Sequence, residues 1–286
     1  MTGCLGVSWS IGTDRSRPTL RHSTGQNARQ IAAARDFWNA VRDERRKLSR
    51  LWTCIGPILD LYREWVAPIG LAARRGIPLK LYTFNAAPNP RRVNLFLGYK
   101  GIQMPSQQIN LREGQQFSSD YRAVNPRCTV PALRLDDGTV LCDAIAICWY
   151  LESRFPQKPL LGSEPLLQAQ VLSWDAYIFS DAFLPVAEAL RNRSEAFKDR
   201  AVPGPGRVSQ IPELEARGRQ RVQLFWQHLD EHLDGREYLV GNAITMADID
   251  AFVVVDFAGW IKERVPENRT RVQVWYERIK ALLPVS

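Results

Sequence analysis

The sequence predicts a small α/β domain followed by an all-helical domain, and three observations support this fold class. Apolar and polar residues alternate over residues 79–84, as in a β-strand, and a stretch rich in Asn and Pro follows. The tripeptide Asp136-Asp137-Gly138 separates two short apolar runs, which is typical of a β-hairpin. Beyond a proline-spaced linker at 156–165, the pattern is helical to the end of the chain.

The predicted element order in the first domain is β-α-β, an irregular link, and then β-β-α. Two glycines close the first helix, and a proline follows the second. The predicted elements are the strands 79–84, 107–111, 130–135 and 139–141, with helices beginning at Val93 and at Asp143.

Three parts of the chain are predicted. Residues 1–76 form a basic N-terminal extension, expected to be disordered or partly helical; residues 77–156 form the α/β domain; residues 166–286 form the all-α domain. A Pro/Gly cluster at 203–206 divides two long helices of this last part. The extension has three open interpretations: a transit-type leader, because residues 1–35 carry five arginines against one aspartate; a surface-binding amphipathic helix; or an extension without a role in the fold.

Composition excludes several classes of protein. Hydrophobic residues make up 45% and charged residues 24%, as in ordinary soluble domains. The net charge is +8, but residues 1–76 hold 13 basic and 6 acidic residues, so the remainder carries only +1 and no nucleic-acid partner is expected. No apolar run reaches the roughly 18 residues of a membrane span. Five cysteines indicate a reducing compartment, and we expect a cytoplasmic protein.

The most informative motif is the segment 125–133, Asn-Pro-Arg-Cys-Thr-Val-Pro-Ala-Leu. A proline that enters the third strand of such a domain is typically cis and exposes the backbone N–H and C=O of Val130. An extended peptide can pair with these groups as an added strand. The helix start at Asp143-Ala144 presents free N–H groups, which suit a carboxylate.

These residues resemble the thioredoxin-like half of the glutathione S-transferase family, whose pattern is N-P-x-G-x-V-P-x-L, then D-G, then a helix beginning E-S-x-A-I. In the second half, residues 238–248 resemble the family signature G-(D/N)-x-x-T-x-A-D, where Thr245 and Asp248 form a capping box. The resemblance spans about residues 78–283. It implies a thioredoxin-like domain followed by a helical bundle, glutathione as co-substrate, and a homodimer.

The resemblance also assigns the glutathione contacts. Val130 would bond the cysteinyl part of glutathione through its backbone, and Pro131 would hold that geometry. The family's γ-glutamyl clamp, Glu then Ser, falls on Asp143 and Ala144, so the acid is one methylene shorter and the hydroxyl is missing. We therefore expect weakened binding. The family's glycine is replaced by Cys128, and the candidates for the glycyl carboxylate are Arg112, Gln115 and Gln116.

The catalytic position departs further from the family. The hydroxyl or thiol that many members place beside the glutathione sulfur falls on Ala87, which has no donor. The tripeptide 87–89, Ala-Pro-Asn, resembles the T-P-N turn of bacterial nu-type members, and an amide N–H can donate to a thiolate. We predict Asn89 as the catalytic residue and Asn85 as the second candidate; the alternative is that both asparagines only shape the turn. Positive potential is expected from the helix N-terminus, Arg91 and Arg92.

Other signals carry less weight. Cys128 is a minor alternative as the attacking group, because most free cysteines are packing residues. The string H-x-x-E-H at 228–232 matches a zinc-peptidase motif, but Gly235 ends the helix and no further ligand follows, so no metal is predicted. The candidates for an apolar second-substrate pocket are Trp174, Tyr177, Phe179, Phe183 and Phe257, with core packing as their alternative role.

The expected function is a glutathione S-transferase of the detoxification type that conjugates or reduces a small hydrophobic electrophile or disulfide. Attack on carbon would give conjugation, and attack on a disulfide would give reductase activity. The alternative is a non-catalytic binding or scaffolding protein on the same fold, which Ala87 and Ala144 favour.

Overall fold

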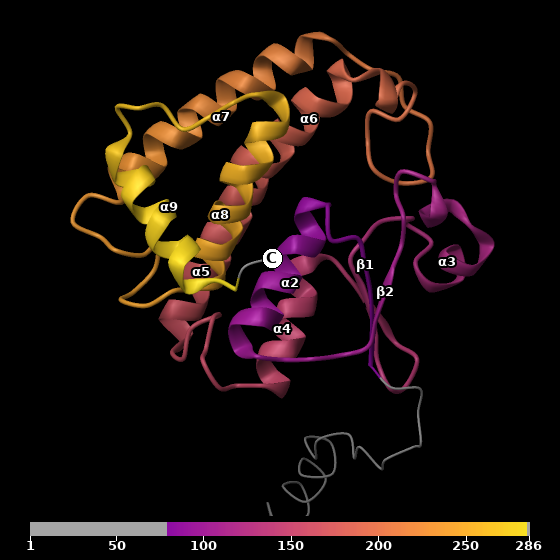
Figure 1. The fold of residues 1–286 in the computed structure, drawn as a ribbon, viewed down its shortest axis with the longest axis horizontal. Coiled ribbons are helices and arrows are strands. Elements are labelled where there is room, and N and C mark those ends of the chain that lie inside the picture. Colours follow the sequence, from indigo (N-terminus) through magenta and orange to yellow (C-terminus); the bar gives the residue numbers. More distant parts are fainter. Residues whose placement is uncertain (1–78, 285–286) are drawn as a thin grey trace, which may run out of the picture. The chain divides into compact units, whose positions relative to one another are not determined.

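The computed structural model describes residues 79–284, and the predictions for residues 1–76 lie outside this range. A sheet flanked by helices comes first in the chain, and a group of longer helices packs beside it (Figure 1). This order agrees with the predicted fold class: a thioredoxin-like α/β domain followed by an all-α domain. No helix within these residues is both long and apolar enough to cross a membrane.

The sheet is mixed, with strand order β2-β1-β3-β4. The first two strands are parallel, and the other neighbours are antiparallel. The predicted hairpin connects the last two strands: the Asp137 carboxylate accepts from the Thr139 N–H at 2.8 Å, and Gly138 takes a φ of +89° that a side chain would disfavour. The strands are β1 (Lys80–Thr83), β2 (Ser106–Gln108), β3 (Ala132–Arg134) and β4 (Val140–Cys142).

Side chains that alternate along the strands are buried on both faces of the sheet. Leu81 and Leu133 belong to the large core beneath α2 (Pro88–Lys100) and α4 (Ala144–Arg154). Their neighbours Tyr82 and Ala132 face the other way and pack in a smaller core with α3 (Ser119–Val124). The alternation follows from the two-residue period of a strand.

Two details of the first domain differ from the prediction. Helix α2 begins at Pro88, not at Val93, because prolines are well accommodated in a first helical turn, where a backbone N–H has no partner to lose. The predicted irregular link contains α3 and a short 3₁₀ turn, Gln115–Phe117, and Ser118 caps α3 by accepting from the Tyr121 N–H at 3.2 Å.

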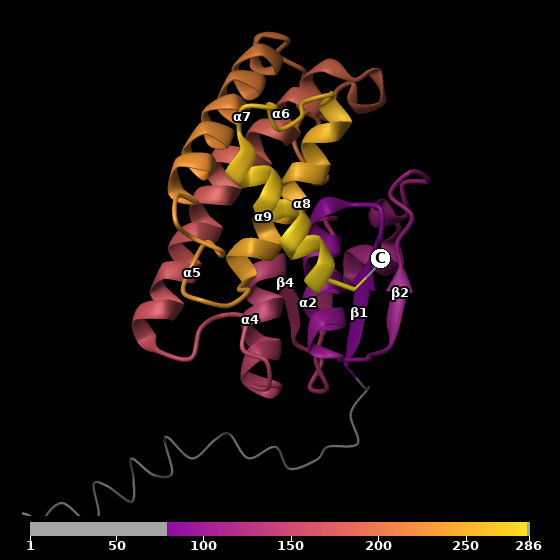
Figure 2. The ribbon, with the colours of Figure 1, turned by 60° about the vertical axis from the view of Figure 1, so that its left-hand side comes forward.

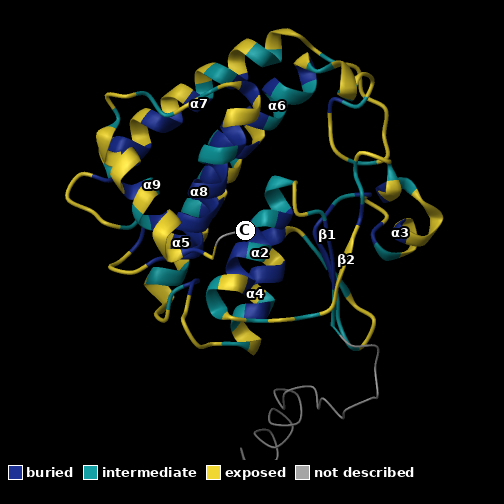
Figure 3. Cartoon of the chain, in the orientation of Figure 1, coloured by how far each residue is buried: buried dark blue, intermediate teal, exposed yellow. Residues whose placement is uncertain are grey.

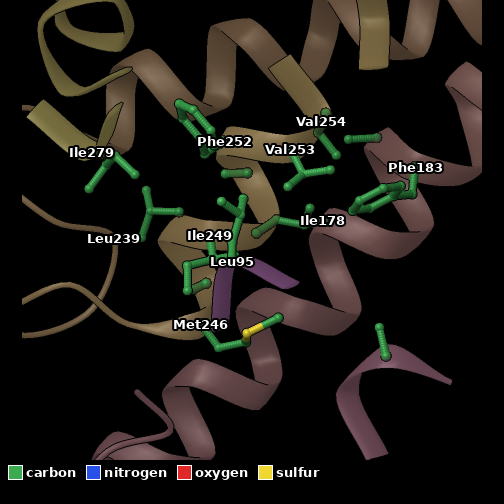
Figure 4. Close-up of a cluster of buried hydrophobic side chains, with 14 of the residues drawn as sticks. Leu95, Ile178, Phe183, Leu239, Met246, Ile249, Phe252, Val253, Val254 and Ile279 are labelled. Atoms are coloured by element: carbon green, nitrogen blue, oxygen red, sulfur yellow. The ribbon is translucent and has the colours of Figure 1, made fainter. Parts of the chain in front are cut away.

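The helical half is centred on α8 (Met246–Ala258), which is apolar almost all round and buried along most of its length (Figure 3). In Figure 4 its residues Ile249, Phe252 and Val253 pack among side chains from α2, α5 and α9. Figure 2 shows this half beside the α2 and α4 side of the sheet. The remaining helices are α5 (Pro165–Ile178), a π-helical segment (Phe179–Phe183), α6 (Leu184–Arg193), α7 (Glu213–His232) and α9 (Thr270–Leu282), and short 3₁₀ turns lie at Glu195–Phe197 and Gly259–Ile261.

The predicted capping element opens α8. The buried Asp248 carboxylate reaches back to the Thr245 N–H at 2.9 Å and also accepts from the Thr245 hydroxyl at 3.0 Å. It accepts in addition from the Leu239 N–H and from the Trp275 indole N–H, both at 2.9 Å. One side chain therefore joins the start of α8 to the preceding loop and to α9.

Candidate functional site

Strand register brings the predicted site segments to one edge of the sheet. Tyr82 of β1 pairs with Ala132 of β3, which in turn pairs with Cys142 of β4. The end of β1, the start of β3 and the end of β4 therefore lie in a row, at the usual strand spacing of roughly 4.8 Å. The segments just beyond them are the turn before α2, the Val130–Pro131 entry to β3, and the start of α4.

The Val130–Pro131 segment leaves backbone groups without partners. The peptide bond between the two residues is cis. The carbonyl of the preceding Thr129 accepts from the Tyr121 hydroxyl at 2.5 Å and from the Asn125 amide at 2.8 Å. By contrast, neither the N–H nor the C=O of Val130 forms a hydrogen bond with any residue in 79–284. These two groups are the ones an extended peptide would use.

The start of α4 is a second set of unpaired donors. Asp143 is the N-cap residue at φ +78°, a conformation that is costly for a side chain, and it does not cap the helix. Its carboxylate accepts instead from the Arg127 guanidinium at 2.8 Å, and both side chains are more than half exposed. The first backbone amides of α4, beginning with that of the buried Ala144, are left without acceptors in the described chain, and the helix dipole favours an anion there.

In the first turn of α2, Asn89 is the residue with hydrogen-bond donors that are unpaired in the described chain. Pro88 and Pro90 have no N–H, and the Arg91 N–H donates to the Ala87 carbonyl at 3.1 Å. The Asn89 backbone N–H has no acceptor within the described residues. Its side chain adds a further donor, the amide Nδ2, which is also unpartnered there.

The second candidate, Asn85, is engaged in the turn. Its amide oxygen accepts from Asn94 Nδ2 at 3.1 Å and from Gln108 Nε2 at 2.9 Å, and its backbone N–H donates to the Gln108 side-chain oxygen at 3.1 Å. These contacts are those of a residue that ties the turn to α2 and β2. A direct role of Asn85 at the sulfur stays a prediction.

Two buried side-chain oxygens of the α/β half have no hydrogen-bond partner in the described chain. They belong to Gln116 and to Thr83 at the end of β1. The neighbouring Gln115, in contrast, accepts from the Asn110 N–H at 2.9 Å. Buried polar atoms are normally paired, so each of these oxygens is an acceptor that the described chain leaves unused.

Arg91 and Arg92 do not act as free positive charges. Arg92 is only 3% exposed, and its guanidinium donates to both carboxylate oxygens of Asp250, at 2.6 and 2.8 Å, and to Asp175. Burial disfavours this charge, but Asp250 and Asp175 more than offset that effect and raise the Arg92 pKa. Arg91 pairs with Asp256 at 2.5 Å. Carboxylates from the helical half therefore compensate the positive potential expected at this turn, a pairing that no local pattern in the sequence signals.

The predicted aromatic pocket residues separate into two groups. Phe179, Phe183 and Phe257 form a row with neighbouring ring centroids 6.3 and 6.1 Å apart, and Arg92 lies 5.1 Å from the Phe183 ring. Trp260, which sequence reasoning missed, extends this row at 5.4 Å from Phe257 and is 52% exposed. The sequence pattern that could have identified Trp260 is its position three residues after Phe257, which places both side chains on the same helical face.

Trp174 and Tyr177 lie instead against the histidines of α7. His228 shares a hydrogen bond of 2.6 Å with the Tyr177 hydroxyl, and His232 Nε2 lies 2.9 Å from the Leu239 carbonyl oxygen. Trp174 contacts both imidazoles. Both histidines of the H-x-x-E-H string are thus used in packing, and residues 79–284 hold no cluster of three or more His, Cys, Asp or Glu suited to a metal ion.

Cys128 occupies the turn before the third strand with a φ of +54°, in the left-handed region that favours glycine. Its side chain is buried at 4% exposure and joins neither of the other described cysteines in a disulfide.

A cavity of about 640 Å³ lies away from these segments, between α5 and the connection from α7 to α8, and is lined by Trp174 and His232. Of the predicted site residues, Trp174 alone lines it; those assigned to glutathione do not.

Comparison with known proteins places both halves of this fold in one family. The description "Glutathione S-transferase, N-terminal domain" matches residues 86–154, and "Glutathione S-transferase, C-terminal domain" matches residues 213–285. Glutathione S-transferase 2 of Saccharomyces cerevisiae is 29% identical over 205 residues, which cover 70% of this chain and 84% of that protein. Maleylacetoacetate isomerase of Pseudomonas aeruginosa is 30% identical over 181 residues, which cover 51% of this chain and 84% of the isomerase.

Solved structures agree with these sequence matches. The crystal structure of Gtt2 from Saccharomyces cerevisiae superimposes with a TM-score of 0.63 at 27% identity, covering 71% of this chain and 100% of that one. The N-terminal match includes Val130, Pro131 and the start of α4, and the C-terminal match includes the Asp248 capping element. This chain therefore belongs to the glutathione S-transferase family.

Proposed function

We propose that the protein is a glutathione-dependent transferase whose bound sulfur is stabilised as a thiolate by Asn89. The observation that carries the proposal is the gathering of unpaired backbone groups at one sheet edge: those of Val130, those at the start of α4, and that of Asn89. Glutathione has complementary groups, because it is an extended peptide with a carboxylate at each end and a thiol between them. The matched family supports the same ligand.

Each part of the site has one role in this proposal. Val130 pairs with the cysteinyl peptide group, and the amides that begin at Ala144 hold the γ-glutamyl carboxylate. Asp143 accepts from the γ-glutamyl ammonium, which requires Arg127 to share or release that carboxylate. Gln116 lies at the glycyl end. Asn89 has no basic group to remove a proton, so it acts by favouring the thiolate that is already present at equilibrium.

The reaction follows from the thiolate. On an electrophilic carbon, the sulfur forms a C–S bond while the leaving group departs with its electron pair. On a disulfide, it forms a new S–S bond and the other sulfur leaves as a thiolate. We assign the second substrate to the aromatic row of Phe179, Phe183, Phe257 and Trp260, which suits a small hydrophobic molecule. We also propose that the protein is cytoplasmic and that its active form is a homodimer. Light scattering of the purified protein tests the dimer.

The second candidate function is a non-catalytic glutathione-binding or scaffolding protein. Ala87 in place of a hydroxyl donor and Ala144 in place of a serine favour it. The two functions differ in turnover. Purified full-length protein is tested for retention on immobilised glutathione, for conjugation of an aryl halide, and for reduction of a small disulfide. Retention without either reaction would favour the scaffold.

Substitution of Asn89 tests the catalytic assignment. In Asn89→Ala we expect kcat/KM at pH 7 to fall about 10–100-fold, because losing one charge-assisted hydrogen bond raises the thiol pKa by about 1–2 units. The rising limb of the pH profile moves to higher pH by the same amount, while the glutathione Kd changes little. Asn242→Ala is the matched control, since Asn242 is an exposed asparagine of the helical half, outside the predicted site. Equal profiles for the wild type and Asn89→Ala would refute the assignment.

Restoring the family's serine tests the γ-glutamyl end. We expect Ala144→Ser to tighten glutathione binding about 2–10-fold, because one added hydrogen bond to the ligand carboxylate is worth about 0.5–1.5 kcal/mol. Calorimetric titration with glutathione measures the change. Ala146→Ser is the control, because Ala146 is exposed and lies two residues further along α4. Unchanged or weaker binding in Ala144→Ser would place the ligand carboxylate elsewhere.

A further inference from the structure

Arg92 lies where the α/β half and the helical half meet. It projects from α2 between Asp250 of α8 and Asp175 of α5, and it donates to both. Arg92 is 3% exposed and Asp250 is fully buried. The two aspartates stand 158 and 83 residues away along the chain, so the cluster forms only when the two halves pack together.

Stability alone is a weak explanation for this cluster. Removing three ionisable groups from water is costly, and well-packed apolar residues of similar volume are often equally stabilising or better. A buried guanidinium does, however, hold its direction, since its flat fork bonds Asp250 at two points. Arg92 is therefore a rigid donor, and the direction of its remaining N–H groups is determined by α5 and α8.

One of those remaining groups reaches Asn89. Arg92 Nη1 donates to the Asn89 amide oxygen at 3.2 Å. Because a guanidinium can only donate, the amide must turn its oxygen toward Arg92. The amide Nδ2 is thereby turned away from Arg92, and it has no acceptor within residues 79–284. The contact decides which end of the Asn89 side chain is available at the predicted sulfur site.

We propose that Arg92 is a positioning residue: anchored by Asp250 and Asp175, it orients the Asn89 amide so that Nδ2 donates to the glutathione sulfur. The inference rests on the proposed function, since it requires glutathione bound with its sulfur beside Asn89. It adds that the helical half, through two buried aspartates, controls the thiolate fraction of a ligand held by the other half. Without Arg92 the amide rotates freely and presents oxygen, which repels a thiolate, for part of the time.

The test is a double-mutant cycle read from the titration of the bound thiol. The ultraviolet absorbance of the thiolate is followed against pH in full-length protein saturated with glutathione. Arg92→Lys keeps the charge but not the fork, and we expect the thiol pKa to rise by about 0.5–1 unit, part of the value of one hydrogen bond. In an Asn89→Ala background the same substitution produces no further rise. Glutathione Kd stays within about threefold, because that substitution leaves the backbone contacts in place.

The controls separate positioning from a general structural effect. Asp256→Asn weakens the other arginine–aspartate contact between α2 and α8 and does not touch Asn89. Because it also uncovers the charge of Arg91, it leaves the thiol pKa unchanged or lowers it, and does not raise it. Asp175→Asn keeps Arg92 but removes the charge of one of its two aspartate partners. If Arg92→Lys does not fold, Asp175→Asn takes its place in the double-mutant cycle with Asn89→Ala, and we expect a smaller rise in the thiol pKa. A thiol shift that persists undiminished in Asn89→Ala overturns the positioning role, and so does the absence of a shift in both Arg92→Lys and Asp175→Asn.

The same data distinguish failure of the proposed function. If Asn89→Ala shifts the thiol titration but the Arg92 and Asp175 variants do not, Asn89 acts at the sulfur without positioning by Arg92. If Asn89→Ala itself shifts nothing, or wild-type protein binds no glutathione, both the catalytic assignment and the positioning role are wrong.

Discussion

Replacing Asp248 by alanine lowers the free energy of unfolding by about 2–6 kcal/mol, because two buried donors lose their acceptor at about 1–3 kcal/mol each. These donors are the Leu239 N–H and the Trp275 indole N–H, on residues only 2% and 1% exposed. The loss is a large part of the roughly 5–15 kcal/mol that stabilises a typical domain. Urea unfolding followed by tryptophan fluorescence measures the change.

Asp248→Asn and Asp234→Ala show whether buried donors cause this loss. The asparagine keeps one oxygen but places an N–H against the Thr245 N–H, so we expect an intermediate loss. Asp234 pairs with Arg271 at the surface, with 73% of its side chain exposed, and its substitution costs little. If Asp248→Ala and Asp234→Ala unfold at the same urea concentration, the joining role of Asp248 is wrong.

Gly218→Ala is expected to lower the free energy of unfolding by about 2 kcal/mol, through overpacking between α6 and α7. A Cβ at this position would lie 2.4 Å from the Pro185 carbonyl oxygen and 3.2 Å from backbone and side-chain atoms of Ala189. Because the first obstacle is backbone, α7 must shift away from α6. The shift outweighs the gain of roughly 1 kcal/mol that alanine brings to a helix interior.

Gly259→Ala provides the comparison for this helix contact. Gly259 has an ordinary helical backbone with a φ of −57°, and an added Cβ there would meet no atom within 4 Å. We expect its unfolding midpoint to be unchanged or slightly raised. The overpacking explanation fails if Gly218→Ala is as stable as Gly259→Ala under the same urea titration.

Most of the fold could be predicted because its signals are local. The hairpin depends on the Asp137 side chain, the Thr139 N–H and the freedom of Gly138, three residues that are adjacent in the chain. The start of α8 depends on Thr245 and Asp248, one helical turn apart. The start of α2 was missed because an Asn/Pro-rich stretch favours a turn and a first helical turn about equally well.

Sequence reasoning could locate only the part of the candidate site that consists of backbone groups. Val130, Pro131 and the start of α4 are recognisable in the sequence because their place in the strand and helix order determines where they lie. The roles of long side chains were less accessible. Arg91 and Arg92 look like free positive charges in the sequence, and only the structure shows the carboxylates that face them.

The sequence by itself determined the fold class and the family, since turns, caps and periodicity act over a few residues, and it predicted the sheet edge at which a peptide would bind. The tertiary structure alone decided which charges are compensated, which end of the Asn89 amide is free, and which aromatic side chains lie near Arg92. Those features depend on Arg92 being held by aspartates more than 80 positions away in the chain. Burial makes these contacts decisive, because a charge removed from water must find its partner within the fold.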